Sequence, residues 1–426
     1  MKLERSTPAV VGFVVAGLLA IWFQHSLIPF TEPYWGLFQN FLDLDVYRAG
    51  AQVALDGGDL YDAKLLGQMD FTYAPLSVVL FAPFAWMSAG LAHLLWTIGI
   101  FVALYLVVIL GFRSLGHDVT WRLRTIALAV VAMSALLEPV RSTIWFGQIN
   151  VFLMLLVVAD LVRPENSRLR GVAAGVAAGI KLTPLMFGAY LLAIRQWRAA
   201  AGMAAGFAGS VAVGFLLMPS GSASFWLGTL FDSDRVSSPQ TYGNQSIRGA
   251  IANFGHTDYP STLLWLLLSA LLVALTGTAA VFAHRHGQEL LALSIVGMTS
   301  CAVSPVAWSH HWVWMVPLLV VAIHLIAEKL SGWRRIGLIL LTVGGVASAV
   351  AWRTHFAFPM WYANRSVEEA YLTGLFFKHP ATFDWFTTQP FTLILVVTSV
   401  VTIVAYRRSP VMSGTELPGA AVGGRR

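Results

Sequence analysis

Two carboxylates and a guanidinium lie within one short stretch, Phe41–Arg48 (FLDLDVYR), of a chain that has few charged side chains. Beside a membrane surface, the apolar residues of this stretch would remove water from the acids, and a partly desolvated carboxylate can accept the proton of a sugar hydroxyl. Two alternatives stay open: a solvated loop in which Asp45 caps a helix, or an Asp-x-Asp site for a divalent metal. Residues 31–72 as a whole contain seven acids against two bases: Glu32, Asp43, Asp45, Asp56, Asp59, Asp62 and Asp70 against Arg48 and Lys64.

Side chains that can hold a phosphate follow further along the chain. Arg141 lies in EPVRST, residues 138–143, and a guanidinium can pair with a phosphate through two parallel N–H groups. Gln148 and Asn150 lie in GQIN, where they offer amides at the mouth of a short apolar helix. For these three residues the alternative interpretation is polar capping of a buried helix end.

Lys181 interrupts an apolar stretch, in GIKLTP at residues 179–184. A charge at the centre of a membrane helix costs about 2.5–3.5 kcal/mol on insertion scales, so it needs a partner there. A substrate phosphate is the natural partner. The alternatives are a side chain that reaches to the membrane surface, or a structural pair with Glu138 or Asp160.

A histidine pair lies among tryptophans in SPVAWSHHW, residues 304–312. Adjacent residues point to different sides of a helix, so we do not expect His310 and His311 to bind one metal. Either histidine can contact a phosphate or a sugar, with Trp308 or Trp312 as a platform. The alternative is an aromatic belt at the membrane surface with incidental histidines.

A polar segment in a large loop, YGNQSIRG at residues 242–249, is a candidate for binding an acceptor through Asn244, Gln245 and Arg248. Its Asn244-Gln245-Ser246 tripeptide also fits the N-glycosylation pattern, which is common by chance. Asp45, Tyr47 and Arg48 are candidates for the same role in the first loop.

The composition indicates a membrane protein. The chain is 57% hydrophobic and 11% charged, whereas soluble domains carry about 25% charged residues. Apolar runs recur over residues 10–405, and only helices satisfy the backbone in lipid when no barrel alternation is visible. The net charge of +6 comes from Lys and Arg between apolar runs, which is an orientation signal and not a nucleic-acid surface. The single cysteine, Cys301, excludes an intrachain disulfide.

The elements that must position these residues follow from the apolar runs. We expect a retained first helix over residues 9–28, an interfacial helix over Val46–Leu55 whose Val46, Ala49 and Val53 face the membrane, a broken or re-entrant segment at 74–87, and a span at 91–112. Three helices are too short for a ~30 Å hydrocarbon layer, at residues 151–162, 171–180 and 185–194. Short helices with a proline between them are tolerated at membrane depth only where they line a cavity.

The charges then give a topology and a fold class. Residues 29–72, 138–150, 219–260, 304–312 and 353–390 are predicted outside. The segments 113–124, 163–170, 195–198, 284–289 and 328–335 are predicted inside, and we expect a disordered cytoplasmic tail at 407–426. The fold class is all-α: one polytopic membrane domain over residues 1–406, with roughly 11–13 membrane helices including short broken ones.

Seven segments resemble, in order and spacing, the polyprenyl-phosphate-mannose-dependent α-mannosyltransferases of actinobacteria, glycosyltransferase family 87 of the C-type glycosyltransferase superfamily. The resemblance covers most of residues 40–320, and within the family it points to the α-1,2-mannosyltransferases that act on phosphatidylinositol mannosides or lipomannan. The segments are FLDLDVY (41–47), FTYAP (71–75), EPVRST (138–143), GQIN (147–150), GIKLTP (179–184), NQSIRG (244–249) and SPVAWSHHWVW (304–314).

The resemblance implies an active site on the outer face of the plasma membrane with an essential aspartate in the first outer loop. That residue falls on Asp43, while Asp45 stands where relatives can have histidine, which weakens the metal alternative. The family's histidine falls on His310 or His311. No cofactor is expected.

We therefore expect inverting transfer of mannose from polyprenyl-phosphate-mannose to a 2-hydroxyl of a mannosylated lipid, with Asp43 as general base. Lys181, Arg141 and a histidine would stabilise the departing phosphate. The alternative is a transporter or flippase of a lipid-linked sugar, which predicts inverted repeats and access from both sides. We find no repeat, and the polar groups gather at one face.

Overall fold

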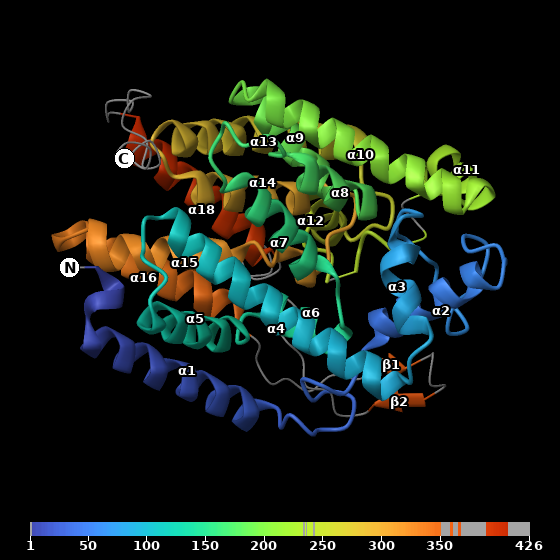
Figure 1. The fold of residues 1–426 in the computed structure, drawn as a ribbon, viewed down its shortest axis with the longest axis horizontal. Helices are drawn as coiled ribbons and strands as arrows, with labels where there is room; N and C mark the ends of the chain where they lie inside the picture. Colours follow the sequence, from blue (N-terminus) through green and yellow to red (C-terminus); the bar gives the residue numbers. More distant parts are fainter. Residues whose placement is uncertain are drawn as a thin grey trace, which may run out of the picture.

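The computed structural model describes residues 2–232, 235, 237–241, 243–350, 358–360, 365–367 and 389–407. Apart from a short antiparallel pair of strands, β1 (Phe358–Met360) and β2 (Arg365–Val367), the regular elements of this part of the chain are helices (Figure 1). This confirms the all-α prediction. The predicted tail at 407–426 lies outside the described residues except for Arg407.

Five helical segments of the described residues are long and apolar enough to cross a membrane, and a sixth span results if one sharply bent helix pair counts as a span. Three shorter apolar helices add to them, so the chain is a polytopic membrane protein. The count of 11–13 membrane helices stays a prediction, because it includes helices that length alone does not place across a membrane. The five segments are α1 (Thr7–Leu27), α4 (Ala89–Ser114), α10 (Trp197–Leu217), α13 (Thr262–Arg285) and the run Ser309–Lys329, which contains η5 (Ser309–Trp312), α15 (Met315–His324) and η6 (Leu325–Lys329).

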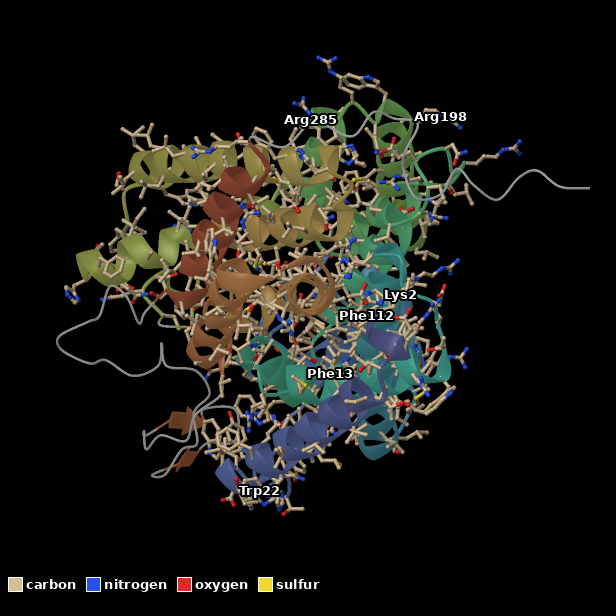
Figure 2. All side chains as sticks on the ribbon, turned by 90° about the vertical axis from the view of Figure 1, so that its left-hand side faces the viewer. Lys2, Phe13, Trp22, Phe112, Arg198 and Arg285 are labelled. Atoms are coloured by element: carbon tan, nitrogen blue, oxygen red, sulfur yellow. The ribbon has the colours of Figure 1, made fainter. Side chains whose placement is uncertain are left out.

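The apolar surface of the outer helices is turned away from the protein. On α1, Leu18 and Trp22 are more than half exposed, and on α13 Leu263 and Leu271 are too. Figure 2 shows Trp22 at the edge of the molecule. Such continuous apolar faces fit a lipid surround. By contrast α14 (Glu289–Val303) is buried along residues 290–302 and lies in the centre of the bundle, as expected for a helix that is apolar all round.

The predicted short helices are present. Helix α7 spans Asn150–Leu161, α8 Val172–Ile180 and α9 Met186–Ala193, with a 3-10 turn, η2 (Thr183–Leu185), before α9. Helix α6 (Glu138–Phe146) meets α7 at an angle of 118°. The bend lies at Gly147, whose φ of 70° is the left-handed conformation that glycine adopts without a Cβ penalty.

Helices α8 and α10 pack with their backbones in close contact. Gly171 and Gly175 face α10, where Gly202 and Gly206 face back. A Cβ on Gly175 would collide with the carbonyl of Met203, and one on Gly206 with the carbonyl of Val172. Small residues four apart on both helices are the usual means of such close approach in membranes. The position of α8 is therefore set by α10.

Helix α2 (Leu42–Leu55) begins earlier than the sequence indicated, and it packs on α3 (Ser77–Ala85). Its N-cap is Phe41, in the left-handed conformation with φ 58°, so Asp45 lies in the first turn and is not the cap. Val46 is buried, and Ala49 and Val53 pack against the protein core, so this face is not turned to the membrane.

The remaining helices complete the bundle: η1 (Leu3–Arg5), α5 (Trp121–Ser134), α11 (Pro219–Leu227), η3 (Thr229–Phe231), α12 (Ile247–Gly255), α16 (Gly332–Ala349) and α18 (Pro390–Tyr406). Figure 1 places the N-terminus and the C-terminal end of α18 on one side of the molecule and α2 with α3 on the opposite side.

Candidate functional site

Helix α2 is fixed against the bend between α6 and α7 at its first turn. The backbone N–H of Phe41 donates to the carbonyl of Trp145 at 2.8 Å, and the ring of Phe41 stacks on His93. Gly147 lies against Leu44, where a Cβ would come within 2.8 Å of the Leu44 Cβ. The glycine of GQIN thus allows α2 to approach closely, and this brings Asp43 to Gln148.

Gln148 binds Asp43 directly. Its Nε2 donates to Asp43 Oδ2 at 2.6 Å. Because a carboxylate only accepts hydrogen bonds, the amide orientation is fixed, and Oε1 faces the other way. That oxygen accepts from Tyr47 Oη at 3.0 Å, from Tyr73 Oη at 3.2 Å and from Asn150 Nδ2 at 3.2 Å. The two phenol oxygens are 2.7 Å apart.

Asn150 carries the network on to Lys181. Its Nδ2 also donates to the backbone carbonyl of His310 at 3.0 Å, which leaves Oδ1 to accept from Lys181 Nζ at 2.9 Å. Lys181 Nζ further lies 3.1 Å from His311 Nε2 and 3.4 Å from Tyr73 Oη. Asp43, Gln148, Asn150, Lys181 and His311 thus form one continuous network, although they come from four separate segments of the chain.

The surroundings of Asp43 shift its protonation. Burial removes much of the water from the carboxylate and raises its pKa to about 6, against the opposing effects of the Gln148 hydrogen bond and the Lys181 charge. The side chain stays half-buried. In the described part of the chain Asp43 Oδ1 accepts no hydrogen bond, so one oxygen of the carboxylate is available to a substrate hydroxyl.

Tyr47 and Tyr73 act as donors in this network. Burial raises the pKa of both phenols, and the negative charge of Asp43 raises it further. Both therefore stay protonated and support the amide oxygen of Gln148. Tyr73 was not among the site residues predicted from the sequence. It does lie in FTYAP, one of the seven segments that carry the family resemblance, so that segment could have pointed to it.

His311 and not His310 faces Lys181, which separates the two histidines that the sequence left equivalent. Lys181 carries hydrogens on Nζ, so His311 Nε2 accepts and its proton lies on Nδ1. In the described part of the chain His311 Nδ1 is buried and has no partner. His310 Nε2 also has no partner there, but its ring packs against Phe146 and Trp308.

A small cavity adjoins the cationic end of the network. His311 and Asn150 line it together with Ser300 and Cys301 of α14, and the rest of its wall is mostly apolar: Leu153, Met154, Thr183, Pro184, Phe187, Val313 and Trp314. The cavity lies between α7, the start of α9 and α14. Two of the three predicted short helices thus line it, whereas α8 contributes no residue to its wall.

Asp45 and Arg48 lie on the other side of α2 and bind each other. Asp45 Oδ1 accepts from Arg48 at 2.9 Å and lies 3.0 Å from His93 Nε2. Burial alone would raise the pKa of Asp45, but His93 and Arg48 outweigh it and lower the pKa. Arg48 also donates to the carbonyls of Phe84 and Met87. Both residues thus join α2 to α3 and α4, which does not support their predicted contact with an acceptor.

Arg141 is buried away from solvent and donates to the carbonyl of Trp35 at 2.6 Å. Its guanidinium also lies 6.0 Å from the ring centre of Trp145. Among the described residues it makes no hydrogen bond to the Lys181 network. Its predicted contact with the donor phosphate therefore lacks support from the geometry, and Arg141 holds the segment that precedes α2.

The 244–249 segment is bound to the backbone of the chain near Ala307. Asn244 and Gln245 are fully buried. Asn244 Oδ1 accepts from the N–H of Ala307 at 3.0 Å, and the N–H of Gln245 donates to the Ala307 carbonyl at 2.7 Å. This burial is contrary to a glycosylation site at Asn244 and does not support acceptor binding by either residue. Arg248 is half-buried, and its guanidinium lies 5.9 Å from the ring centre of Trp265.

The two tryptophans beside the histidines differ. Trp308 is half-buried, so part of its ring is exposed, and its role as a platform for a sugar stays a prediction. Trp312 is fully buried and packs against Phe391, so it belongs to the core and does not offer a platform.

Comparison with known proteins gives one family. A family model described as glycosyltransferase family 87 matches residues 71–305. A Mycobacterium tuberculosis protein named polyprenol-phosphate-mannose-dependent alpha-(1-2)-phosphatidylinositol mannoside mannosyltransferase is 36% identical over 73% of this chain and 77% of its own length. A Mycolicibacterium smegmatis protein of the same name is 38% identical over 72% and 74%.

A second M. smegmatis protein, named for phosphatidylinositol pentamannoside in place of phosphatidylinositol mannoside, is 36% identical over 76% of this chain and 80% of its own length. No solved structure matches the chain.

Proposed function

Since the chain belongs to glycosyltransferase family 87 and is a glycosyltransferase, we propose that it transfers mannose from polyprenyl-phosphate-mannose to the 2-hydroxyl of a mannosylated phosphatidylinositol lipid or lipomannan. The names of the relatives support this donor, this acceptor class and an α-1,2 link. The observation that carries the proposal is the Asp43–Gln148–Asn150–Lys181–His311 network, which joins a base to a cation at a cavity.

Asp43 acts as the general base in this reaction. Its open Oδ1 takes the proton of the acceptor 2-hydroxyl as that oxygen forms a bond to C1 of the mannose. The bond between C1 and the phosphate oxygen breaks on the opposite face, and the electron pair leaves with the phosphate. A β-linked donor therefore gives an α-linked product. Because a phosphate is a good leaving group, one carboxylate suffices where an inverting glycosidase needs two.

Lys181 and His311 stabilise the departing phosphate. The ammonium group of Lys181 is held by Asn150 and His311, so little reorganisation is needed when negative charge develops beside it. His311 Nδ1–H offers a further donor. The side-chain amides of Gln148 and Asn150 lie between Asp43 and Lys181 and keep them from forming a direct ion pair. The carboxylate of Asp43 and the ammonium group of Lys181 therefore both stay available to substrates.

Polyprenyl-phosphate-mannose can be held with its prenyl chain in lipid. The described helices that line the small cavity beside this network are short or bent, and such helices are tolerated at membrane depth where they surround space within the protein. The flippase alternative is disfavoured, because the matched family and the named relatives are transferases.

Purified protein tests the reaction directly. Incubation with labelled polyprenyl-phosphate-mannose and a mannolipid should move the label into the acceptor without a second protein. A matched acceptor that lacks only the terminal 2-hydroxyl should stay unlabelled. The proposal fails if both acceptors are labelled equally, or if label crosses vesicle membranes without entering either lipid. A panel of phosphatidylinositol mannosides and lipomannan fragments then identifies the acceptor.

The active site is proposed to lie on the outer face. The side opposite to α2 carries Lys2, Arg198 and Arg285 (Figure 2), and basic residues favour the cytoplasmic side. A maleimide that does not cross membranes tests this in intact cells, in a Cys301→Ser background. Asp59→Cys, an exposed position just after α2, should react, and Arg168→Cys, exposed between α7 and α8, should react only after the cells are opened. The reverse pattern would contradict the orientation.

A further inference from the structure

A second cluster of titratable side chains lies at the end of the molecule opposite to α2. It consists of Glu4 of η1, His117 between α4 and α5, His324 at the end of α15 and Glu328 of η6. The side chains of Glu4, His117 and His324 are at most 3% exposed, and that of Glu328 is 14% exposed. Figure 2 looks onto this end of the molecule and labels Lys2 and Phe112 there; the ring of Phe112 packs against that of His117. The proposed transfer reaction uses none of these residues.

The cluster brings together three side chains that could hold a metal ion. His117 Nε2 lies 2.9 Å from His324 Nδ1. Glu328 Oε2 lies 4.0 Å from His324 Nδ1, the nitrogen that faces His117, whereas its Oε1 lies 3.6 Å from His117 Nδ1, on the Glu4 side of that ring. One ligand atom from each of these three residues lies within 4.8 Å of the others. His324 and Glu328 are four residues apart, so they share a helix face.

Glu4 fixes the tautomer of His117. Its Oε2 lies 2.8 Å from His117 Nδ1, so the N–H of that nitrogen donates a hydrogen bond to the carboxylate. The lone pair of the neutral ring is then on Nε2, which faces His324. A carboxylate behind the distal nitrogen of a histidine is the usual support of a metal-bound imidazole.

The carboxylates of the cluster favour a cation beside them. Two carboxylates lie together in this cluster, and Lys2 pairs with one of them, with Nζ 3.9 Å from Glu4 Oε1 and a side chain that is 38% exposed. Only one proton fits between the two facing nitrogens. A divalent ion in that place accepts both lone pairs and offsets both carboxylates, which removes much of the cost of burying them.

We propose that His117, His324 and Glu328 bind a divalent transition metal, with Zn²⁺ the best fit, and that Glu4 orients His117. Tetrahedral Zn²⁺ has Zn–N bonds of about 2.0–2.1 Å, which sets its two nitrogens about 3.3 Å apart. The ion would fit if the two nitrogens moved a few tenths of an ångström further apart than the observed 2.9 Å. The metal replaces the proton that lies between the two rings.

The site joins segments that are far apart in the sequence. Glu4 precedes the first membrane helix, His117 follows α4, and His324 with Glu328 ends the Ser309–Lys329 span. The backbone N–H of Leu3 also donates to Glu328 Oε1 at 2.5 Å. A metal at this point holds three membrane segments together at one end of the bundle, so its role is structural and its removal lowers stability.

Metal content of the purified full-length protein tests the proposal. The protein carries a tag without histidines, is stripped with a chelator, is incubated with Zn²⁺ alone and is washed before elemental analysis. We expect about one zinc per chain in the wild type and a higher temperature of unfolding with zinc than without. His117→Gln and His324→Gln should lose most of the bound zinc and the zinc-dependent shift.

Two further variants sharpen this test. Glu4→Gln should keep the site but weaken zinc binding by about 10–100-fold, the usual effect of removing such a support. His284→Gln is the matched control, since His284 lies 2.6 Å from Glu289 in a separate histidine–carboxylate pair, and it should retain the wild-type zinc content. A wild type that retains no zinc overturns the proposal, whatever the folding of the variants. Equal zinc in His117→Gln and the wild type also overturns it.

Discussion

The two sides of the first turn of α2 carry the same residue type in opposite surroundings. On one side Asp43 meets an uncharged amide, keeps one oxygen open and has a raised pKa of about 6. On the other side Asp45 is held by Arg48 and His93, and its pKa is lowered. Two residues along a helix turn the side chain by about 200°. The difference teaches that the partners set the charge and the open hydrogen-bonding positions of each carboxylate, since the residues themselves are alike.

The strongest test of this contrast is the loss of the carboxylate at position 43. Asp43→Asn should lower the rate of mannose transfer by about 10²–10⁴-fold, because a general base contributes that much. Donor binding should persist, since the cationic end of the network stays intact. Turnover of the purified variant, alongside photo-crosslinking to a donor analogue, measures both. Near-normal turnover would show that Asp43 is not the base.

Removal of the cation should have the next largest effect. Lys181→Gln should lower the rate by about 10²–10³-fold, the usual cost of losing one preorganised group that stabilises developing charge. Lys181→Arg is the control, because it retains the charge and should recover part of the activity. The role of Lys181 in phosphate departure would be refuted if the Gln variant worked as well as the Arg variant.

The raised pKa of Asp43 predicts how the rate depends on pH. The base acts only when ionised, so kcat/KM should rise with pH through about 6. Gln148→Leu removes a hydrogen bond that favours the ionised form, so the pKa of Asp43 should rise and this limb should move to higher pH. A pH–rate profile of both proteins measures the shift.

Gln52→Leu is the matched control for that profile. Gln52 lies on the same helix and donates to the exposed carboxylate of Asp56 at 2.9 Å. Its replacement should leave the profile in place. If both variants shifted the limb alike, the shift would reflect a general disturbance of α2 and not the hydrogen bond to Asp43.

The smallest effect is expected on the other side of the turn. Asp45→Asn should leave the transfer rate near that of the wild type and lower the free energy of unfolding by about 0.2–1 kcal/mol, since its ion pair is only partly buried. Turnover and thermal unfolding, measured on the same preparation of the variant, give its transfer rate and its stability. A loss of activity as large as that of Asp43→Asn would remove the distinction between the two carboxylates.

The sequence predicted the parts of the site that depend on local pattern. A lysine within an apolar stretch must find a polar partner, and helices too short to span lipid must surround polar space, so Lys181 and the α7–α9 region were recognisable. The choice of Asp43 over Asp45 needed the family resemblance, because periodicity alone does not say which side of α2 faces α6.

Residues whose role depends on distant packing could not be predicted. Asn244 resembles a surface residue in sequence, yet its amide bonds a backbone sixty-three residues later. Arg141 lies near the site in sequence, but α6 turns it toward Trp35. Tyr73 and His93 gain their roles only when their segments meet α2. In each case, the partner is supplied by another element.

The close backbone packing of α8 on α10 has a consequence for genetics. Lys181 directly follows α8, and Gly175 lies six residues earlier, about 9 Å along the helix axis. An alanine at Gly175 or Gly206 would wedge the two helices apart and carry the ammonium group with it. A screen for inactive alleles should therefore recover glycine substitutions at positions that pack against the facing helix and lie outside the Lys181 network.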